Sequence, residues 1–199
     1  PWISTVRNNI KSAAEAGNIT LDPADTTPPT GTDVMALADA ATMTKDEQKE
    51  MIAGMVQRLR DRLVEEPNDT EGWLRLARAY NVLDQAENAL DALANGAKST
   101  PDNLDLQLAL LEQILTMGTT KAKIERAKLV LATVEKIAPN DPQILFFKGH
   151  LAQLSGDNQQ ARRAWQKLKD ILDPESDAVK ALEAEIDKLS KPKNEKNNF

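Results

Sequence analysis

Residues 66–101 read EPNDTEGWLRLARAYNVLDQAENALDALANGAKSTP. Apolar and small residues recur in this stretch at spacings that suit two short helices joined by a turn. The positions that would pack the two helices together, with the proline that follows the second one, are Trp73, Leu76, Ala77, Tyr80, Ala89, Leu93, Gly96 and Pro101. Proline ends a helix because it cannot donate to the helical ladder and its ring clashes with the preceding turn.

Prolines also mark a period along the chain. They lie 34, 38 and 35 residues apart, at Pro67, Pro101, Pro139 and Pro174. A period of about 34 residues in a helical composition is typical of the tetratricopeptide repeat (TPR), whose helix pairs stack because one pair cannot bury its faces alone. The eight positions above match the offsets of that repeat. The sequence therefore predicts an all-α fold, a helical-repeat solenoid of about three TPR units.

The same pattern divides the chain into segments. We expect a TPR domain over residues 44–190, with repeats at about 70–103, 104–141 and 142–174 and a cap helix at 175–190. A helix at about 45–65 should precede the first repeat, because a capping box at 44–47 is followed by apolar residues at helical spacing. We expect residues 1–43 to hold a short helix and a Pro/Thr-rich linker, and residues 191–199 to form a disordered tail.

Composition excludes several classes of protein. The chain has 199 residues, a formal net charge of −6 and 4% aromatic residues. Nucleic-acid-binding domains usually carry a basic excess, so the charge argues against that class, and we expect no nucleic acid as partner. The absence of cysteine excludes disulfide scaffolds, thiolate metal sites and cysteine nucleophiles. A single histidine, His150, excludes a multi-histidine metal site.

No motif typical of catalysis is present. The chain has no phosphate-binding glycine loop, no HExxH and no GxSxG. Asp and Glu are spread along the predicted helices, often beside Lys or Arg, as on solvated helix faces. We expect no enzyme activity, no cofactor and no metal.

The ends of the chain carry a further expectation. No apolar run approaches the length that a membrane-spanning helix needs. The chain begins with Pro1 rather than methionine, so we expect a processed or truncated piece. Any membrane anchor would then lie upstream, outside this sequence.

The first helix of each TPR lines a concave groove, and this face is the candidate binding site. The residues expected there are Leu74, Arg78, Asn81, Leu108, Glu112, Leu115, Phe146, His150 and Gln153. Leu74, Leu108 and Phe146 hold the same offset in successive repeats and would form an apolar stripe. Such a stripe with a polar rim suits the apolar face of an amphipathic helix. The alternative is that residues 1–16, the linker or the cap helix of this chain fill the groove.

A longer stretch goes beyond a general TPR pattern. Residues 51–63 read MIAGMVQRLRDRL and lead directly into EPNDTEGWLRLARAYNVL at 66–83. This combination resembles the periplasmic domain of the cytochrome c maturation factors of the CcmI (CycH) family. The resemblance covers about residues 35–101 most closely. One departure is Asp84, where the turn of the repeat usually has glycine.

The resemblance implies a chaperone step. Members of that family hold apocytochrome c, largely by its C-terminal helix, and deliver it to the haem-ligation complex. It also implies a periplasmic domain whose membrane helices precede it in the chain. The alternatives are a structural adaptor that assembles membrane-complex subunits without binding substrate, a related factor for haem attachment to nitrite reductase, and a direct haem-binding or pH-sensing role for His150.

Overall fold

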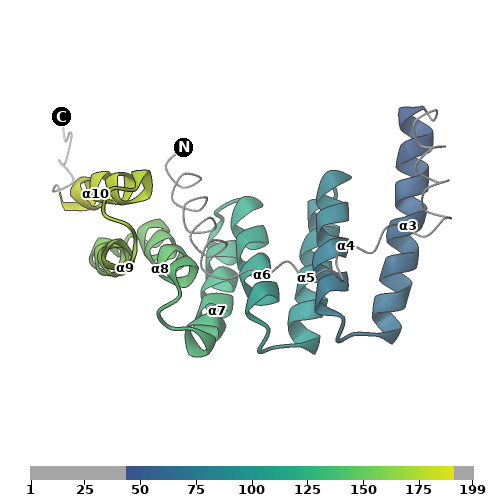
Figure 1. Cartoon of the computed structure of the whole chain (residues 1–199), viewed down its shortest axis with the longest axis horizontal. Helices are drawn as coiled ribbons and strands as arrows, with labels where there is room; N and C mark the ends of the chain where they lie inside the picture. The colour runs from purple at the N-terminus through teal and green to yellow at the C-terminus, as the bar shows by residue number, and fades with distance from the viewer. Residues whose placement is uncertain (1–43, 191–199) are drawn as a thin grey trace. The chain divides into compact units, whose positions relative to one another are not determined.

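A computed structural model describes residues 44–190 of the chain (Figure 1). Within that range the chain forms eight α-helices. They are α3 (Lys45–Glu65), α4 (Thr70–Val82), α5 (Ala86–Ser99), α6 (Leu104–Thr116), α7 (Lys121–Ile137), α8 (Pro142–Leu154), α9 (Asn158–Ile171) and α10 (Asp177–Ser190). The predicted all-α TPR fold is confirmed. The segments predicted over residues 1–43 and 191–199 lie outside the described residues.

Short polar side chains cap the N-termini of the helices that the sequence pattern predicts. Asp69 Oδ1 accepts from the Gly72 amide at the start of α4 (2.8 Å). Asp141 Oδ1 accepts from the Gln143 amide (2.7 Å), and Pro142 takes the first position of α8. These contacts satisfy amides that have no partner inside the helix.

The C-terminal helix begins two residues later than position 175, where the sequence pattern places it. Ser176 Oγ accepts from the Val179 amide (3.3 Å), and α10 starts at Asp177. Asp173 instead accepts from the Glu175 amide (3.1 Å) in the preceding turn. Ser176 therefore caps the helix, because Asp173 is already engaged in the turn.

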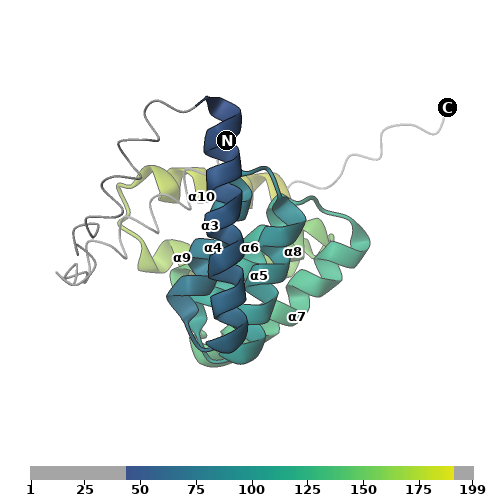
Figure 2. The ribbon, with the colours of Figure 1, turned by 90° about the vertical axis from the view of Figure 1, so that its right-hand side faces the viewer.

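Two compact units make up the described chain, and their boundary falls inside α6, between Ala109 and Leu110. In the first unit α3, α4 and α5 stand side by side, with α4 packed on both α3 and α5 (Figures 1 and 2). The start of α6 is tied to the end of α5 by the buried Gln107. Its Nε2 donates to the carbonyls of Ala97 (3.3 Å) and Pro101 (3.1 Å).

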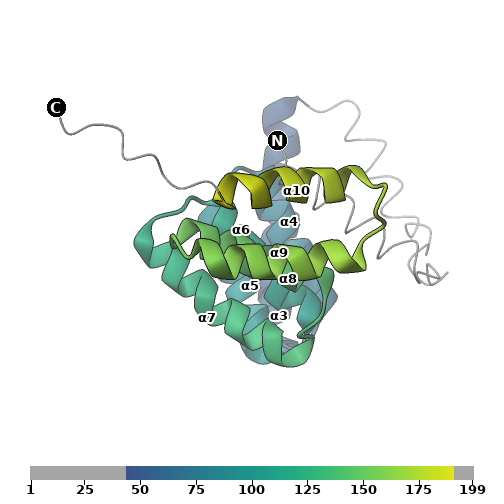
Figure 3. The same ribbon diagram turned by 90° about the vertical axis from the view of Figure 1, so that its left-hand side faces the viewer.

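In the second unit α7 packs on α8, and α8 packs on α9. The last helix, α10, lies alongside α9 (Figure 3). It buries Ala178, Val179 and Leu182. This is the packing expected of a cap helix that closes a repeat array.

A tryptophan and a glycine fill the contact between paired helices in two of the repeats. In the first, Trp73 of α4 lies against Gly96 of α5, where an added Cβ would come within 2.7 Å of the Trp73 Cγ. In the third, Gly149 of α8 lies under Trp165 of α9, and an added Cβ would overlap the indole. The large residue is on the first helix in one pair and on the second helix in the other. Each indole needs a partner without a side chain.

The turn between α4 and α5 holds a non-glycine residue with a left-handed backbone. Asp84 has φ of +58°, and Gly156 has φ of +80° in the matching turn between α8 and α9. Left-handed backbone costs an L-residue roughly 1–2 kcal/mol, less for Asp, while glycine adopts it freely. The departure of Asp84 from the usual glycine therefore leaves the turn conformation in place.

We expect Asp84→Gly to raise the free energy of unfolding by up to about 1 kcal/mol, because relief of the backbone strain exceeds the added entropy of the unfolded chain. Guanidinium unfolding followed by circular dichroism would measure it. The matched control is Gly156→Ala, which forces a Cβ into the same backbone region and should destabilise the protein. A loss of stability in Asp84→Gly would contradict this account of the turn.

Candidate peptide-binding surface

The nine residues predicted for the groove lie on α4, α6 and α8, the first helices of the three repeats. On α4, in the first unit, Leu74 is half-buried while Arg78 and Asn81 are exposed. Their spacing of four and three residues places them on one face of the helix. In the same unit Leu108, at the start of α6, is 7% exposed.

The second unit holds the other five. Glu112 and Leu115, on the later part of α6, are both half-buried. On α8, His150 and Gln153 are half-buried, whereas Phe146 is 2% exposed. Phe146 contacts Phe147 edge-on with ring centroids 5.5 Å apart.

Exposure within this set differs from the pattern that the sequence suggests. Of the predicted stripe, Leu74 keeps an accessible surface, and Leu108 and Phe146 contribute to helix packing. The stripe runs from one unit to the other, so its continuity stays a prediction.

His150 lies in an apolar setting on α8. Its ring stacks on Phe146 with centroids 6.3 Å apart and planes 11° from parallel. Its Nδ1 is buried without a hydrogen-bond partner among the described residues. Burial lowers the pKa of His150 from its ordinary value of 6.5, because the charged ring loses its hydration there.

The lowered pKa of His150 makes the free energy of unfolding fall as the pH falls. The unfolded chain binds the His150 proton more readily than the folded chain does, so the stabilising effect is complete above pH 6.5. It is lost as the pH falls from 6.5 toward the lower folded-state pKa. We expect His150→Gln to flatten the fall in unfolding free energy between about pH 7 and about pH 5. Denaturant titrations at several pH values would show it, and parallel curves for the two proteins would contradict it.

Two clefts that the sequence analysis did not predict lie at matching places in the first and third repeats. The first, of about 410 Å³, has Leu76, Asp91 and Asn95 in its lining. The other, of about 370 Å³, has Lys148, Arg163 and Lys167. Each residue of the second set stands 72 positions after its counterpart, which is also the distance from the start of α4 to the start of α8. Aligning the two repeats by that offset shows that Arg163 and Lys167 of the third repeat replace Asp91 and Asn95 of the first.

No group of three His, Asp or Glu side chains suitable for a metal ion occurs between residues 44 and 190. None of the helices in that part of the chain is long and apolar enough to span a membrane.

The repeat architecture and the residue pattern over 51–83 are matched by one protein family. The family described as "Cytochrome c-type biogenesis protein H TPR domain" aligns with residues 21–179. The chain belongs to this family. The resemblance noted from the sequence is thereby confirmed: the chain carries the TPR domain of a family of c-type cytochrome biogenesis proteins.

Curated relatives agree with the family. The cytochrome c-type biogenesis protein CycH of Rhizobium meliloti (strain 1021) is 46% identical over 65 residues, 33% of this chain and 17% of that protein. CycH of Bradyrhizobium diazoefficiens is 33% identical over 82 residues, 41% of this chain and 22% of that protein. The aligned stretches thus span less than a quarter of the length of these relatives.

Solved structures support the fold. A crystal structure of MamA superposes with a TM-score of 0.51 at 17% identity, covering 73% of this chain and 88% of that chain. A second MamA crystal structure gives 0.53 at 16% identity, covering 73% of this chain and 80% of that chain. At this level of identity the likeness concerns the fold alone.

Proposed function

We propose that the chain is a binding module for apocytochrome c in the periplasm. It would hold the C-terminal helix of apocytochrome c in the concave face of its TPR helices and deliver it to the haem-ligation complex. Membership of the biogenesis family over residues 21–179 is the observation that carries this proposal. We further propose that the domain acts by binding alone, that it uses no cofactor, and that an anchor upstream of this sequence holds it at the membrane.

The accessible surface of the first helices supports recognition of an amphipathic helix. Leu74 and Leu115 offer half-buried apolar contacts, and exposed Arg78 offers a charge beside Leu74. Burying an anchor side chain contributes roughly 1.5–3 kcal/mol, while ordering a disordered segment costs about 2–5 kcal/mol. Two or more anchors are therefore needed, which agrees with a site spread over several repeats.

Release needs no nucleotide in this proposal. When the holocytochrome folds, it buries the apolar face of its own C-terminal helix. That intramolecular contact competes with the TPR surface for the same face. Haem attachment would therefore lower the affinity of the module for its cargo.

A matched pair of leucine substitutions tests where the helix binds. Leu74→Glu should weaken binding of a peptide copy of the apocytochrome c C-terminal helix by about tenfold or more, because a buried apolar contact is replaced by a charge. Leu129→Glu makes the same change at a leucine of α7 that is 74% exposed, and should leave affinity within about twofold.

Fluorescence anisotropy would measure the affinities, and circular dichroism would verify that both variants fold. The partly exposed Leu74 is preferred to Phe146 because Phe146 is 2% exposed and a charge there would unfold α8. Equal affinities for wild type and Leu74→Glu would remove the inner face of α4 from the binding site.

A further inference from the structure

We propose that the third repeat carries a second binding site, a basic cleft that takes an acidic peptide segment of a partner protein. The cleft has a volume of about 370 Å³ and lies within the second unit, where α9 meets α8 and the turn before α8. This proposal does not depend on the groove predicted for the first helices.

The chemistry of the cleft is that of a carboxylate receptor. Arg163 and Lys167 lie one helical turn apart on α9, and both side chains are exposed. Between residues 44 and 190 neither forms an ion pair. An arginine can hold a carboxylate through two parallel hydrogen bonds, and a lysine one turn away supplies a second positive charge.

The other charged residues of the cleft are already engaged. Lys148 Nζ lies 2.6 Å from Glu135 Oε1, so its charge is balanced by α7. Asp157 Oδ1 accepts from the Gln160 amide (2.9 Å) as the cap of α9. Asp157 keeps its negative charge, but Arg163 and Lys167 outnumber it, so the lining of the cleft has a net positive charge.

Packing does not explain these cations. The first repeat forms the matching cleft with Asp91 and Asn95 at the equivalent positions. The repeat architecture thus accepts an acidic or neutral lining there. The cleft of the first repeat has one cation, Arg60 of α3, beside Asp91, whereas α9 gives the cleft of the third repeat two cations at the positions of Asp91 and Asn95.

The basic surface continues from Arg163 toward the side of α9 that faces α10. A neighbouring cleft of about 290 Å³ shares Arg163 and adds Arg162, Gln166 and Ile186. A peptide lying across α9 would meet a third cation there, together with an apolar side chain from α10. Leu145 and Ala164 are both buried and form the apolar floor of the cleft of about 370 Å³ in the third repeat.

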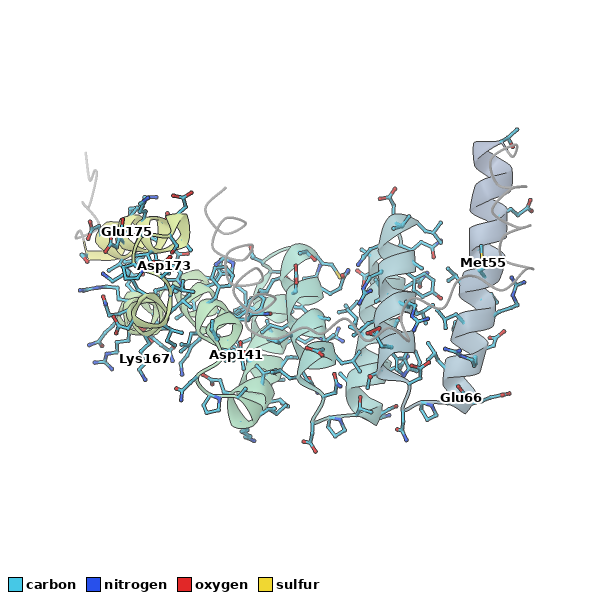
Figure 4. The ribbon with its side chains drawn as sticks, viewed as in Figure 1. Met55, Glu66, Asp141, Lys167, Asp173 and Glu175 are labelled. Atoms are coloured by element: carbon cyan, nitrogen blue, oxygen red, sulfur yellow. The ribbon has the colours of Figure 1, made fainter. Side chains whose placement is uncertain are left out.

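The flanking charges favour a peptide over an anionic membrane. Lys167 lies on the side of α9 opposite α10, while Asp173 and Glu175 lie on the connection between the two helices (Figure 4). Along α10, Glu183 Oε1 is 2.8 Å from Lys169 Nζ. Polybasic membrane sites need about four to eight cations. Within residues 44–190 the two clefts offer three cations without an ion pair, Arg162, Arg163 and Lys167, which suits a narrow segment with a few carboxylates.

The test measures binding of a fluorescent peptide by the whole chain. The probe is an acetylated, amidated peptide in which one leucine is preceded by two glutamates and followed by two more. The control peptide has glutamine in place of each glutamate. We expect saturable binding of the glutamate peptide and none of the glutamine peptide. The double variant Arg163→Asp with Lys167→Asn installs the residues of the first repeat. It should lower the affinity by about tenfold, and added salt should weaken the wild-type affinity.

The matched control makes the same change of charge elsewhere on the second unit. Arg126→Asp with Lys121→Asn alters two exposed residues of α7 that line neither cleft. This control should bind the glutamate peptide within about twofold of wild type. Equal loss in both double variants would reduce the effect to net charge and overturn the proposal.

Two other results would overturn it as well. One is failure of the wild type to bind the glutamate peptide, or equal binding of the glutamine peptide. The other is binding of phosphatidylglycerol vesicles in place of the peptide, with the same dependence on Arg163, which would make the site a membrane contact. Circular dichroism of each variant shows whether a lost signal comes from misfolding. If the Arg163 variant were unfolded, Arg163→Gln would repeat the test.

Discussion

Replacing Gly149 by leucine is expected to lower the free energy of unfolding by about 3 kcal/mol or more. A Cβ at this position of α8 would overlap the indole of Trp165, which is fully buried. The indole is rigid and surrounded by the core, so α8 and α9 would have to separate. Denaturant unfolding followed by circular dichroism would measure the loss.

The control for this prediction is Gly54→Leu on α3. A Cβ at Gly54 meets nothing closer than the tip of Arg58, at 3.9 Å. Leucine there should be neutral or slightly stabilising, because it favours the helix more than glycine does. Unchanged stability in Gly149→Leu would mean that the Trp165 contact does not hold α8 against α9.

Trp73→Ala should lower the free energy of unfolding by about 3–5 kcal/mol, because it leaves a cavity between α4 and α5. The side chain is 5% exposed and packs on Gly96, and its Nε1 donates to the Pro67 carbonyl (2.9 Å). The loss includes both the cavity and this hydrogen bond.

A second substitution makes the test specific. Gly96→Leu alone should destabilise the protein, since a Cβ there would lie 2.7 Å from the Trp73 Cγ. Combined with Trp73→Ala it should restore part of the lost stability by filling the cavity, so the two effects should not add. Additive losses would show that the two positions do not share one packing contact.

The helical-repeat fold was predictable because its signals are local. Spacing of Trp73, Leu76 and Tyr80 defines the buried face of α4, and prolines separate successive helix pairs. The exact start of α10 was not predictable, because Asp173, Pro174 and Ser176 each offer a reasonable first turn. Which helix of a pair carries the tryptophan and which the glycine differs between the first and third repeats. This depends on contacts between helices, and the spacing of residues along one helix does not specify them.

The groove itself stays a prediction, and the exposure of its residues differs from what their spacing suggests. Offsets within the repeat placed Leu74 and Phe146 on equivalent helix faces, and α4 and α8 carry them as expected. The degree of burial depends on the neighbours that cover each face, and it differs: Leu74 is half-buried and Phe146 is 2% exposed. The basic cleft was missed because its residues lie on α8, α9 and the turn before α8, and only an alignment of the first and third repeats by their 72-residue offset brings them together.

The central claim is that this domain by itself recognises the C-terminal helix of an apocytochrome c. Calorimetric titration of the chain with a synthetic peptide of that helix, beside a peptide of the same composition in shuffled order, tests it most directly. We predict saturable binding of the native peptide and none of the shuffled one. Equal binding of both peptides, or of neither, would contradict the claim.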